Sequence, residues 1–273
     1  MTHKDKNQLI HDKIAVPTAR PRTSRPRLLE LLSQNLAAYN ATVINGRAGT
    51  GKTTLAADFA RRANRSVCWY KVEAADADLS VFCRYLAATV RLQRPSLDQD
   101  RLCAITDSAE SDRAELLAEG FVFELAEPRR AEVEPLVIVI EDLHLVYDAE
   151  WVVPFFHRLL PLLPADVHLI LTCRSLPPAP LWRMRSKQML RVIQESELAF
   201  TFEETLRLFE TYGLSAEHAR VALRETNGRA AAVAIFAATP GLAGRRVADS
   251  FLAIEPRQVK LGQMIPDLQP DLT

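Results

Sequence analysis

Runs of apolar residues alternate along the chain with amphipathic stretches. Apolar side chains that recur every three or four residues predict helices, whereas short continuous apolar runs predict strands covered on both faces. Strands are therefore expected at 41–44, 66–72, 136–140, 167–174 and 189–193. Helices are expected at 25–39, 53–63, 79–92, 113–127 and 151–163. The polar, irregular segment 93–111 is expected to be a surface loop.

The alternation of strand and helix from about 41 to 193 predicts an α/β fold with a parallel sheet between two layers of helices. Three helical stretches at 201–213, 215–226 and 229–239 then predict a small all-helical unit. Its first helix opens with a capping box, Thr201 through Glu204. We divide the chain into an N-terminal arm, an α/β domain, a helical subdomain and a tail or truncated linker: 1–25, 26–198, 199–240 and 241–273.

Composition changes this picture little. Of 273 residues, 48% are hydrophobic and 25% charged, as in an ordinary globular protein, and the formal net charge of zero gives no general attraction to nucleic acid. Basic residues gather at 19–27, which we interpret as a solvated arm, with a phosphate or DNA contact as the alternative. No direct DNA-binding element is visible.

The cellular setting is predicted from what the sequence lacks. The polar N-terminus has no signal-peptide core, and no apolar run approaches the roughly 18 residues that span a membrane. The four cysteines show no metal-ligand spacing: Cys68, Cys83, Cys103 and Cys173. We therefore expect reduced thiols in a cytoplasmic protein without membrane association.

The strongest chemical signal is a glycine-rich loop between the first strand and an Ala-rich helix. It satisfies the pattern G-x-x-x-x-G-K-[ST], followed by a second threonine: Gly46, Arg47, Ala48, Gly49, Thr50, Gly51, Lys52, Thr53 and Thr54. In such a loop the backbone N–H groups cradle phosphate oxygens, and the helix directs its positive end toward the anion. Lys52 would reach the β- and γ-phosphates, and the Thr53 hydroxyl would ligate Mg²⁺.

An acidic pair supplies the second anchor that a metal needs at such a site. Glu141 and Asp142 directly follow an apolar strand. One carboxylate would hold Mg²⁺, directly or through water, and the other could polarise the attacking water. The sequence leaves open which residue has which role.

A third element is the buried strand that ends in Thr172 and Arg174. If this strand neighbours the acidic one, Arg174 could contact the γ-phosphate, and a solvated arginine at a strand exit is the alternative. His144 is interpreted as structural rather than catalytic. The three tryptophans are interpreted as core or packing residues: Trp69, Trp151 and Trp182.

Taken in order, these segments resemble the nucleotide-binding region of STAND NTPases, the signalling branch of P-loop ATPases. The resemblance is greatest to MalT-like, LuxR-type ATP-dependent transcriptional regulators and covers roughly 13–235. It rests on the segments "KIAVPTARPRTSRPRLLELL", "GRAGTGKTTL", "WYKVEAADADLSVFCRYLAATV", "VIVIEDLHLV", "LILTCRSLPPAPLWRMR" and "ELAFTFEET". The α/β domain is accordingly expected to be a three-layer P-loop NTPase fold.

The resemblance implies roles for particular residues. It assigns phosphate and metal to Lys52 and Thr53, the acidic pair to Glu141 and Asp142, and the γ-phosphate sensor to Arg174. Pro17 and Arg25 lie where the family holds the adenine. The implied ligands are ATP or ADP with Mg²⁺, and the implied behaviour is self-association or binding of a partner protein in the ATP state.

The chain also departs from the family. Glu141 stands where the family usually has Asp, and Arg229 stands where it commonly has Trp. The winged-helix, repeat-sensor and DNA-binding domains that follow in the family are not readable before Thr273, so DNA binding and inducer recognition do not carry over.

Four functions are compared. The leading expectation is an ATP-binding switch with slow ATPase activity that serves as the nucleotide-binding module of a transcriptional or signal-transduction regulator. The second is a nucleotide-dependent scaffold without turnover, since the longer Glu141 could shift the metal. The third is an AAA-type mechanical ATPase, which would need an arginine finger from a neighbour. A small-molecule kinase is the weakest, because nothing resembles an acceptor site or a lid.

Overall fold

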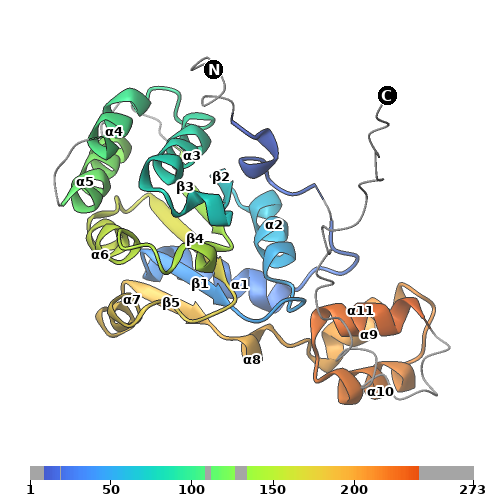
Figure 1. The fold of residues 1–273 in the computed structure, drawn as a ribbon. Coiled ribbons are helices and arrows are strands. Elements are labelled where there is room, and N and C mark those ends of the chain that lie inside the picture. The colour runs from blue at the N-terminus through green and yellow to red at the C-terminus, as the bar shows by residue number, and fades with distance from the viewer. Residues whose placement is uncertain (1–8, 19, 108–111, 127–133, 240–273) are drawn as a thin grey trace, which may run out of the picture.

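A five-stranded parallel sheet forms the centre of the computed structural model, which describes residues 9–18, 20–107, 112–126 and 134–239 (Figure 1). The strand order is β2-β3-β4-β1-β5. The strands are β1 (Ala41–Asn45), β2 (Ser66–Lys71), β3 (Leu136–Glu141), β4 (Val167–Cys173) and β5 (Leu190–Ile193). The predicted α/β fold is confirmed.

Helices cover both faces of the sheet because its strands are apolar on both sides. In β3, Ile138 and Ile140 pack into one hydrophobic cluster, and Val137 and Val139 pack into the other. One face carries α1 (Pro26–Ala38) and α2 (Lys52–Arg62). The opposite face carries α3 (Leu79–Arg91), α4 (Gln99–Thr106), α5 (Arg113–Ala126) and α6 (Val152–Leu162).

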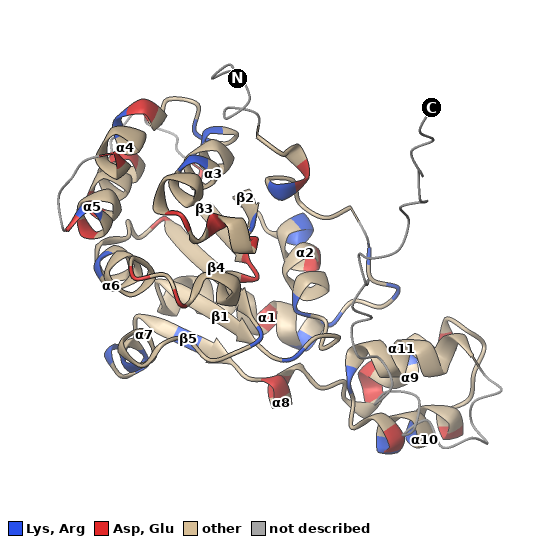
Figure 2. Ribbon diagram, in the orientation of Figure 1, with Lys and Arg blue, Asp and Glu red and all other residues tan. Residues whose placement is uncertain are grey.

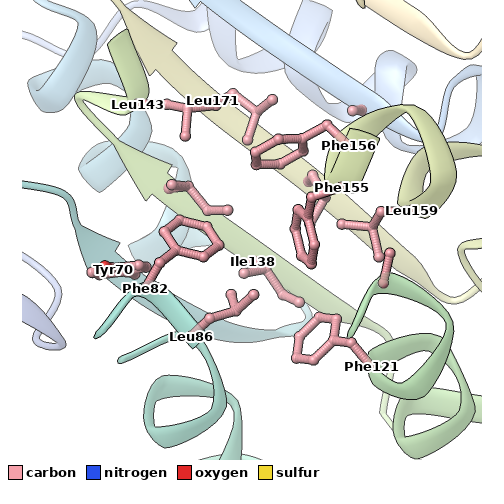
Figure 3. Packing of buried hydrophobic residues seen from close by; sticks show 14 of the residues in the cluster. Tyr70, Phe82, Leu86, Phe121, Ile138, Leu143, Phe155, Phe156, Leu159 and Leu171 are labelled. Atoms are coloured by element: carbon pink, nitrogen blue, oxygen red, sulfur yellow. The ribbon is translucent and has the colours of Figure 1, made fainter. Parts of the chain in front are cut away.

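Aromatic side chains fill the larger of the two clusters (Figure 3). Phe82 of α3 meets Phe155 of α6 edge-on, with ring centroids 5.7 Å apart, and Phe155 meets Phe156 at 5.1 Å. Such edge contacts add about 0.5–1.5 kcal/mol each to the burial of the rings. The contact between Phe82 and Phe155 joins α3 to α6 above the sheet.

The expectation of a surface loop at 93–111 is wrong for part of that segment. Residues Gln99–Thr106 form α4, and Leu102 is fully buried against α3 and α5. The helix begins at Asp98, whose carboxylate accepts the backbone N–H of Arg101 as an N-cap. Only a few residues of α4 are buried, so its apolar pattern is too sparse in the sequence to predict a helix. Residues 108–111 lie outside the described part of the chain.

Three helices form the expected helical unit after β5. They are α9 (Phe202–Glu210), α10 (Ala216–Thr226) and α11 (Ala230–Ala238), and they share a small core around Phe209 and Phe236. The predicted capping box of Thr201 and Glu204 is confirmed at the start of α9. The division into four segments remains a prediction, and residues 1–8 and 240–273 of the arm and tail lie outside the described ranges.

Short elements complete the structure. They are α7 (Ala179–Trp182), α8 (Glu195–Leu198), and the 3₁₀ helices η2 (His11–Lys13), η3 (Ala74–Ala77), η4 (Leu143–Val146) and η5 (Arg183–Lys187). Among the described residues, none of the helices has the length and apolar character required to cross a membrane.

The strand register positions the candidate site. Asn45 of β1 pairs with Cys173 of β4, and Lys71 of β2 pairs with Glu141 of β3. Because all strands are parallel, the loops that follow β1, β3 and β4 leave the same edge of the sheet, which is where ligands bind in open α/β sheets.

Candidate nucleotide-binding site

The glycine-rich loop turns sharply between β1 and α2. Gly49 and Gly51 have φ angles of 79° and 87°, in the left-handed region that favours glycine. Gly51 is the N-cap residue of α2, so the first N–H groups of that helix open into the loop. This backbone has the form of an anion cradle, as the motif predicted.

Lys52 lies across this loop with its side chain largely buried. Its ammonium donates to the carbonyl oxygens of Gly46 at 2.6 Å and Arg47 at 3.0 Å. Burial lowers the pKa of Lys52, and the charge of nearby Asp142 opposes this effect. The cation is therefore held beside the loop by neutral acceptors, in a position where phosphate oxygens could replace the carbonyls.

The acidic strand end meets the loop directly. The Thr53 hydroxyl donates to Oε1 of Glu141, although the two residues are 88 positions apart. Glu141 is 5% exposed. A hydroxyl and a carboxylate are oxygen donors of the kind that Mg²⁺ prefers. The described residues contain no cluster of three or more His, Cys, Asp or Glu side chains that could hold a metal alone. The Thr53 hydroxyl and the Glu141 carboxylate therefore fit a Mg²⁺ ion whose other ligands are substrate phosphates and water rather than protein side chains.

Asp142 occupies a different environment from its neighbour. Its backbone is left-handed, with φ of 57°, and its N–H donates to the Thr172 hydroxyl at 3.0 Å. This bond connects the ends of β3 and β4. The Asp142 carboxylate lies 3.8 Å from Nε of Arg174 and 3.8 Å from Nδ1 of His144. Asp142 thus faces the positive groups at the strand exits, whereas Glu141 faces the loop.

The structure brings Arg174 to the acidic pair, as expected if β4 neighbours β3. Its side chain is half-exposed, so it is available to an incoming anion. Burial lowers the pKa of His144, partly offset by Asp142. The interpretation of His144 as a structural residue stays a prediction.

Trp69 has a contact that sequence reasoning missed. Its indole Nε1 donates to Oε2 of Glu141 at 3.2 Å, while its ring packs in the core. A tryptophan in an apolar strand looks the same in sequence whether or not its N–H reaches a functional group. Only the pairing of β2 with β3 reveals the contact.

A cavity of about 420 Å³ opens beside the loop, between the N-terminal segment and the helical unit. Among its lining residues are Arg22, Thr54, Phe200 and Tyr212, and the guanidinium of Arg22 lies 4.7 Å from the Tyr212 ring. The volume falls within the range of small-ligand sites. An aromatic and cationic wall suits a flat heterocyclic ring.

The two residues expected near an adenine differ in placement. Arg25 lines the cavity, but its guanidinium pairs with Glu204 at 2.9 Å and donates to the carbonyl of Leu198 at 2.8 Å. Pro17 does not belong to the described lining, and its carbonyl accepts a hydrogen bond from Arg61 at 3.1 Å. Arg22 and Tyr212 are cavity residues that the sequence did not single out.

The helical unit touches the loop itself, through a group of interactions that we call the loop contact. Arg229 donates to the carbonyl of Ala48 at 2.5 Å, and the N–H of Ala231 donates to the carbonyl of Gly49 at 2.9 Å. Outside the loop contact, Arg47 pairs with Glu195 of α8, the short helix that precedes the helical unit and is coloured red in Figure 2. Arg229 therefore contacts the glycine-rich loop.

With this geometry established, comparison with known proteins defines the class. Residues 23–171 match the model of the AAA ATPase domain family, which is more than half of the chain. The chain belongs to this family.

Two curated relatives within the matches are transcriptional regulators. The chain is 30% identical over 205 residues to the HTH-type transcriptional regulator MalT of Serratia proteamaculans, and 32% identical over 206 residues to that of Yersinia enterocolitica. Each match covers 74% of this chain but only 22% of the relative. The chain thus spans about a fifth of the length of these regulators.

Solved structures share the fold. A Signal Transduction ATPase with Numerous Domains (STAND) protein with a tetratricopeptide repeat sensor from Pyrococcus horikoshii superposes with a TM-score of 0.55 at 21% identity, over 78% of this chain and 29% of that one. A Walker-type ATPase of Pyrococcus abyssi superposes with a TM-score of 0.51 at 15% identity, and the match covers 86% of this chain and 74% of that one. The predicted resemblance to a P-loop NTPase of the STAND and MalT type is confirmed.

Proposed function

We propose that this chain is a nucleotide-dependent switch module that binds ATP and ADP with Mg²⁺ and hydrolyses ATP slowly. The observation that carries the proposal is the loop contact. One phosphate-binding loop touches the acidic pair through Thr53 and the helical unit through Arg229. A change at the phosphates can therefore reach the helical unit without passing through the rest of the fold.

The geometry of the loop and the cavity supports the proposed phosphate-binding roles. The loop N–H groups and Lys52 would bind the phosphate chain, and the cavity lined by Arg22 and Tyr212 would hold the base. Thr53 with Glu141 or Asp142 would hold Mg²⁺, which supplies charge neutralisation at the phosphates when bound. Arg174, beside Asp142, would contact the γ-phosphate.

The γ-phosphate would distinguish two states. ADP would leave the loop contact in place, giving a closed form with the helical unit docked. ATP would place an additional charged group near Arg174 and the acidic pair and favour an open form that self-associates or binds a partner protein. Output through DNA, as the regulators named MalT suggest, would need segments that match the remainder of those longer proteins.

Binding and assembly measurements test the switch. Calorimetry should give different affinities for ADP and for a non-hydrolysable ATP analogue, and light scattering should give a larger particle with the analogue. Equal affinities together with equal particle size would rule out the switch.

Lys52→Ala tests the phosphate site itself. A hydrogen bond from a charged group contributes about 1.5–3 kcal/mol, so nucleotide affinity should fall on the order of ten- to a hundredfold. Arg61→Ala is a matched control, since Arg61 lies on the same helix and donates to the carbonyl of Pro17 instead. Unchanged affinity in Lys52→Ala would contradict the assignment.

A scaffold without turnover is the second candidate, favoured by the environment of Glu141. Its carboxylate is engaged by both Thr53 and Trp69, which restricts its freedom to activate water. Tight nucleotide binding with no release of phosphate over hours would support the scaffold. Phosphate release that is abolished in Lys52→Ala would support the slow ATPase.

A further inference from the structure

The contact between Trp69 and Glu141 joins the hydrophobic core to the candidate metal site. Trp69 is 1% exposed and Glu141 is 5% exposed. Trp69 pairs in register with Val139, two residues before Glu141 on the neighbouring strand. Since alternate residues of a strand share a face, this register places the indole and the carboxylate on the same side of the sheet. The contact is therefore set by the strand pairing.

The two oxygens of Glu141 have separate partners. Oε2 accepts the indole N–H of Trp69, and Oε1 accepts the hydroxyl of Thr53. Within the described part of the chain, no Lys or Arg forms an ion pair with Glu141. Each carboxylate oxygen has two lone pairs, so one hydrogen bond leaves each with capacity for a cation. A buried carboxylate held by neutral donors is well suited to a divalent ion.

Glutamate also needs more restraint than aspartate at this position. Its side chain has one more rotatable bond, and holding it in one geometry costs conformational entropy. A donor fixed in the core can reduce the number of geometries that the carboxylate samples before the metal arrives. The rigid indole of Trp69, buried among the residues of the second core cluster, is such a donor.

We propose that Trp69 is a positioning residue for a metal-binding carboxylate. Its N–H fixes Oε2 of Glu141, so that Oε1 stays beside the Thr53 hydroxyl, where a divalent cation would be ligated together with the nucleotide. The inference rests on the proposed nucleotide-binding function. Groups that orient a metal ligand in this way typically affect metal affinity by about 10–100-fold.

The test distinguishes the contribution of the Trp69 N–H from the contribution of the packing of its ring. Trp69→Phe keeps an aromatic ring in the core and removes the donor. Trp151→Phe is the matched control, because Trp151 is also buried and its indole donates to the carbonyl of Ala77 at 2.7 Å, in a contact that does not involve Glu141. Thermal unfolding monitored by circular dichroism first shows that both variants are folded.

Calorimetric titration with ADP at a series of free Mg²⁺ concentrations then gives the Mg²⁺ dependence of binding. In Trp69→Phe, the Mg²⁺ concentration that gives half of the maximal increase in ADP affinity should rise at least about tenfold. Affinity for ADP in excess EDTA should not change. Trp151→Phe should match the wild type in both measurements. Equal Mg²⁺ dependence in the two variants would overturn the proposal.

A second measurement leaves Trp69 in place and therefore holds even if Trp69→Phe does not fold. In the variant Trp151→Phe/Trp182→Phe, Trp69 is the remaining tryptophan, since the chain has three. Adding Mg²⁺ to its ADP complex should change the indole emission, and Glu141→Gln in the same background should abolish that change. Emission that does not respond to Mg²⁺ would overturn the proposal. Failure of the wild type to bind any nucleotide would instead overturn the underlying function.

Discussion

The helical unit is attached to the α/β part by two sets of contacts that differ in burial. The first, which we call the anchor, is the ion pair of Arg25 and Glu204, with side chains 8% and 4% exposed. The second is the loop contact, in which the guanidinium of Arg229 donates to the carbonyl of Ala48 through an exposed hydrogen bond. The comparison indicates which attachment can break during a functional cycle.

The Arg25 side of the anchor has several partners besides Glu204. The guanidinium of Arg25 lies 4.3 Å from the Phe200 ring and also donates to the carbonyls of Leu198 and Ala199. Glu204 receives the N–H of Thr201 as part of the capping box. Separating these groups would leave charges buried without partners, at high cost. The anchor is therefore suited to act as a fixed pivot.

The loop contact contains weaker interactions, and it touches the residues that would bind phosphate. A typical intramolecular hydrogen bond contributes only about 0.5–1.5 kcal/mol net. Most of its polar groups can be solvated when it opens. A nucleotide-dependent motion should therefore release the loop contact and keep the anchor.

The largest effect is expected from breaking the anchor. Glu204→Gln leaves the cation of Arg25 buried without its counter-ion, which costs about 3–5 kcal/mol. Urea denaturation at pH 7 should show this loss in the free energy of unfolding. Arg27→Ala is the control, because Arg27 lies 3.5 Å from the other oxygen of Glu204 and is more exposed. A loss below about 1 kcal/mol in Glu204→Gln would remove the distinction between the contacts.

The anchor should also be sensitive to acid. Burial raises the pKa of Glu204, but the hydrogen bond and charge of Arg25 outweigh it, so the folded pKa lies below the ordinary value of 4.5. The stabilisation is fully present above that value and is lost as pH falls through the lower folded pKa. The difference in unfolding free energy between wild type and Glu204→Gln should shrink below about pH 4.5. A constant difference down to pH 3 would contradict the ionic character of the anchor.

A smaller effect is expected for Arg229→Ala. Loss of its hydrogen bond to the carbonyl of Ala48 should lower stability by about 0.5–1.5 kcal/mol. It should also reduce the difference between the affinities for ADP and for an ATP analogue, because the docked form loses a contact. Arg224→Ala on α10 is the control, since Arg224 is exposed and pairs with its neighbour Glu225. An unchanged affinity ratio in Arg229→Ala would exclude Arg229 from the switch.

The smallest effect is expected for Arg47→Ala. Because its ion pair with Glu195 is exposed and joins the loop to α8 rather than to the helical unit, the free energy of unfolding should change little. The change should diminish further as NaCl is raised from 0.05 to 0.5 M, since salt screens exposed charges. A salt-independent loss in urea denaturation as large as that of Glu204→Gln would contradict the exposed character of this ion pair.

The sequence predicted the parts of the site that depend on local order. A strand, a glycine loop and a helix follow one another in the chain, so the phosphate loop and the glycines that adopt positive φ could be recognised. The acidic strand end was likewise recognisable because Glu141 and Asp142 follow an apolar run. The capping box was recognisable because its two residues, Thr201 and Glu204, stand three positions apart in the chain.

Contacts that join distant segments could not be predicted in the same way. Arg25 and Glu204 are 179 residues apart, and Arg229 and Ala48 are 181 apart, so no local pattern connects them. Arg25 was expected near a base, yet its guanidinium is used by the anchor. In helix α4, the apolar pattern was too sparse to be distinguished from a loop.

Hydrogen–deuterium exchange of the full chain tests the central difference between the two attachments most directly. Peptides covering the start of α11, where the N–H of Ala231 donates to the carbonyl of Gly49, report the loop contact, and peptides covering the start of α9 report the anchor. With ADP and Mg²⁺, both regions should be protected. With a non-hydrolysable ATP analogue, exchange should accelerate at the start of α11 and remain slow at the start of α9. Equal exchange at α11 in the two nucleotide states would contradict a loop contact that responds to the γ-phosphate.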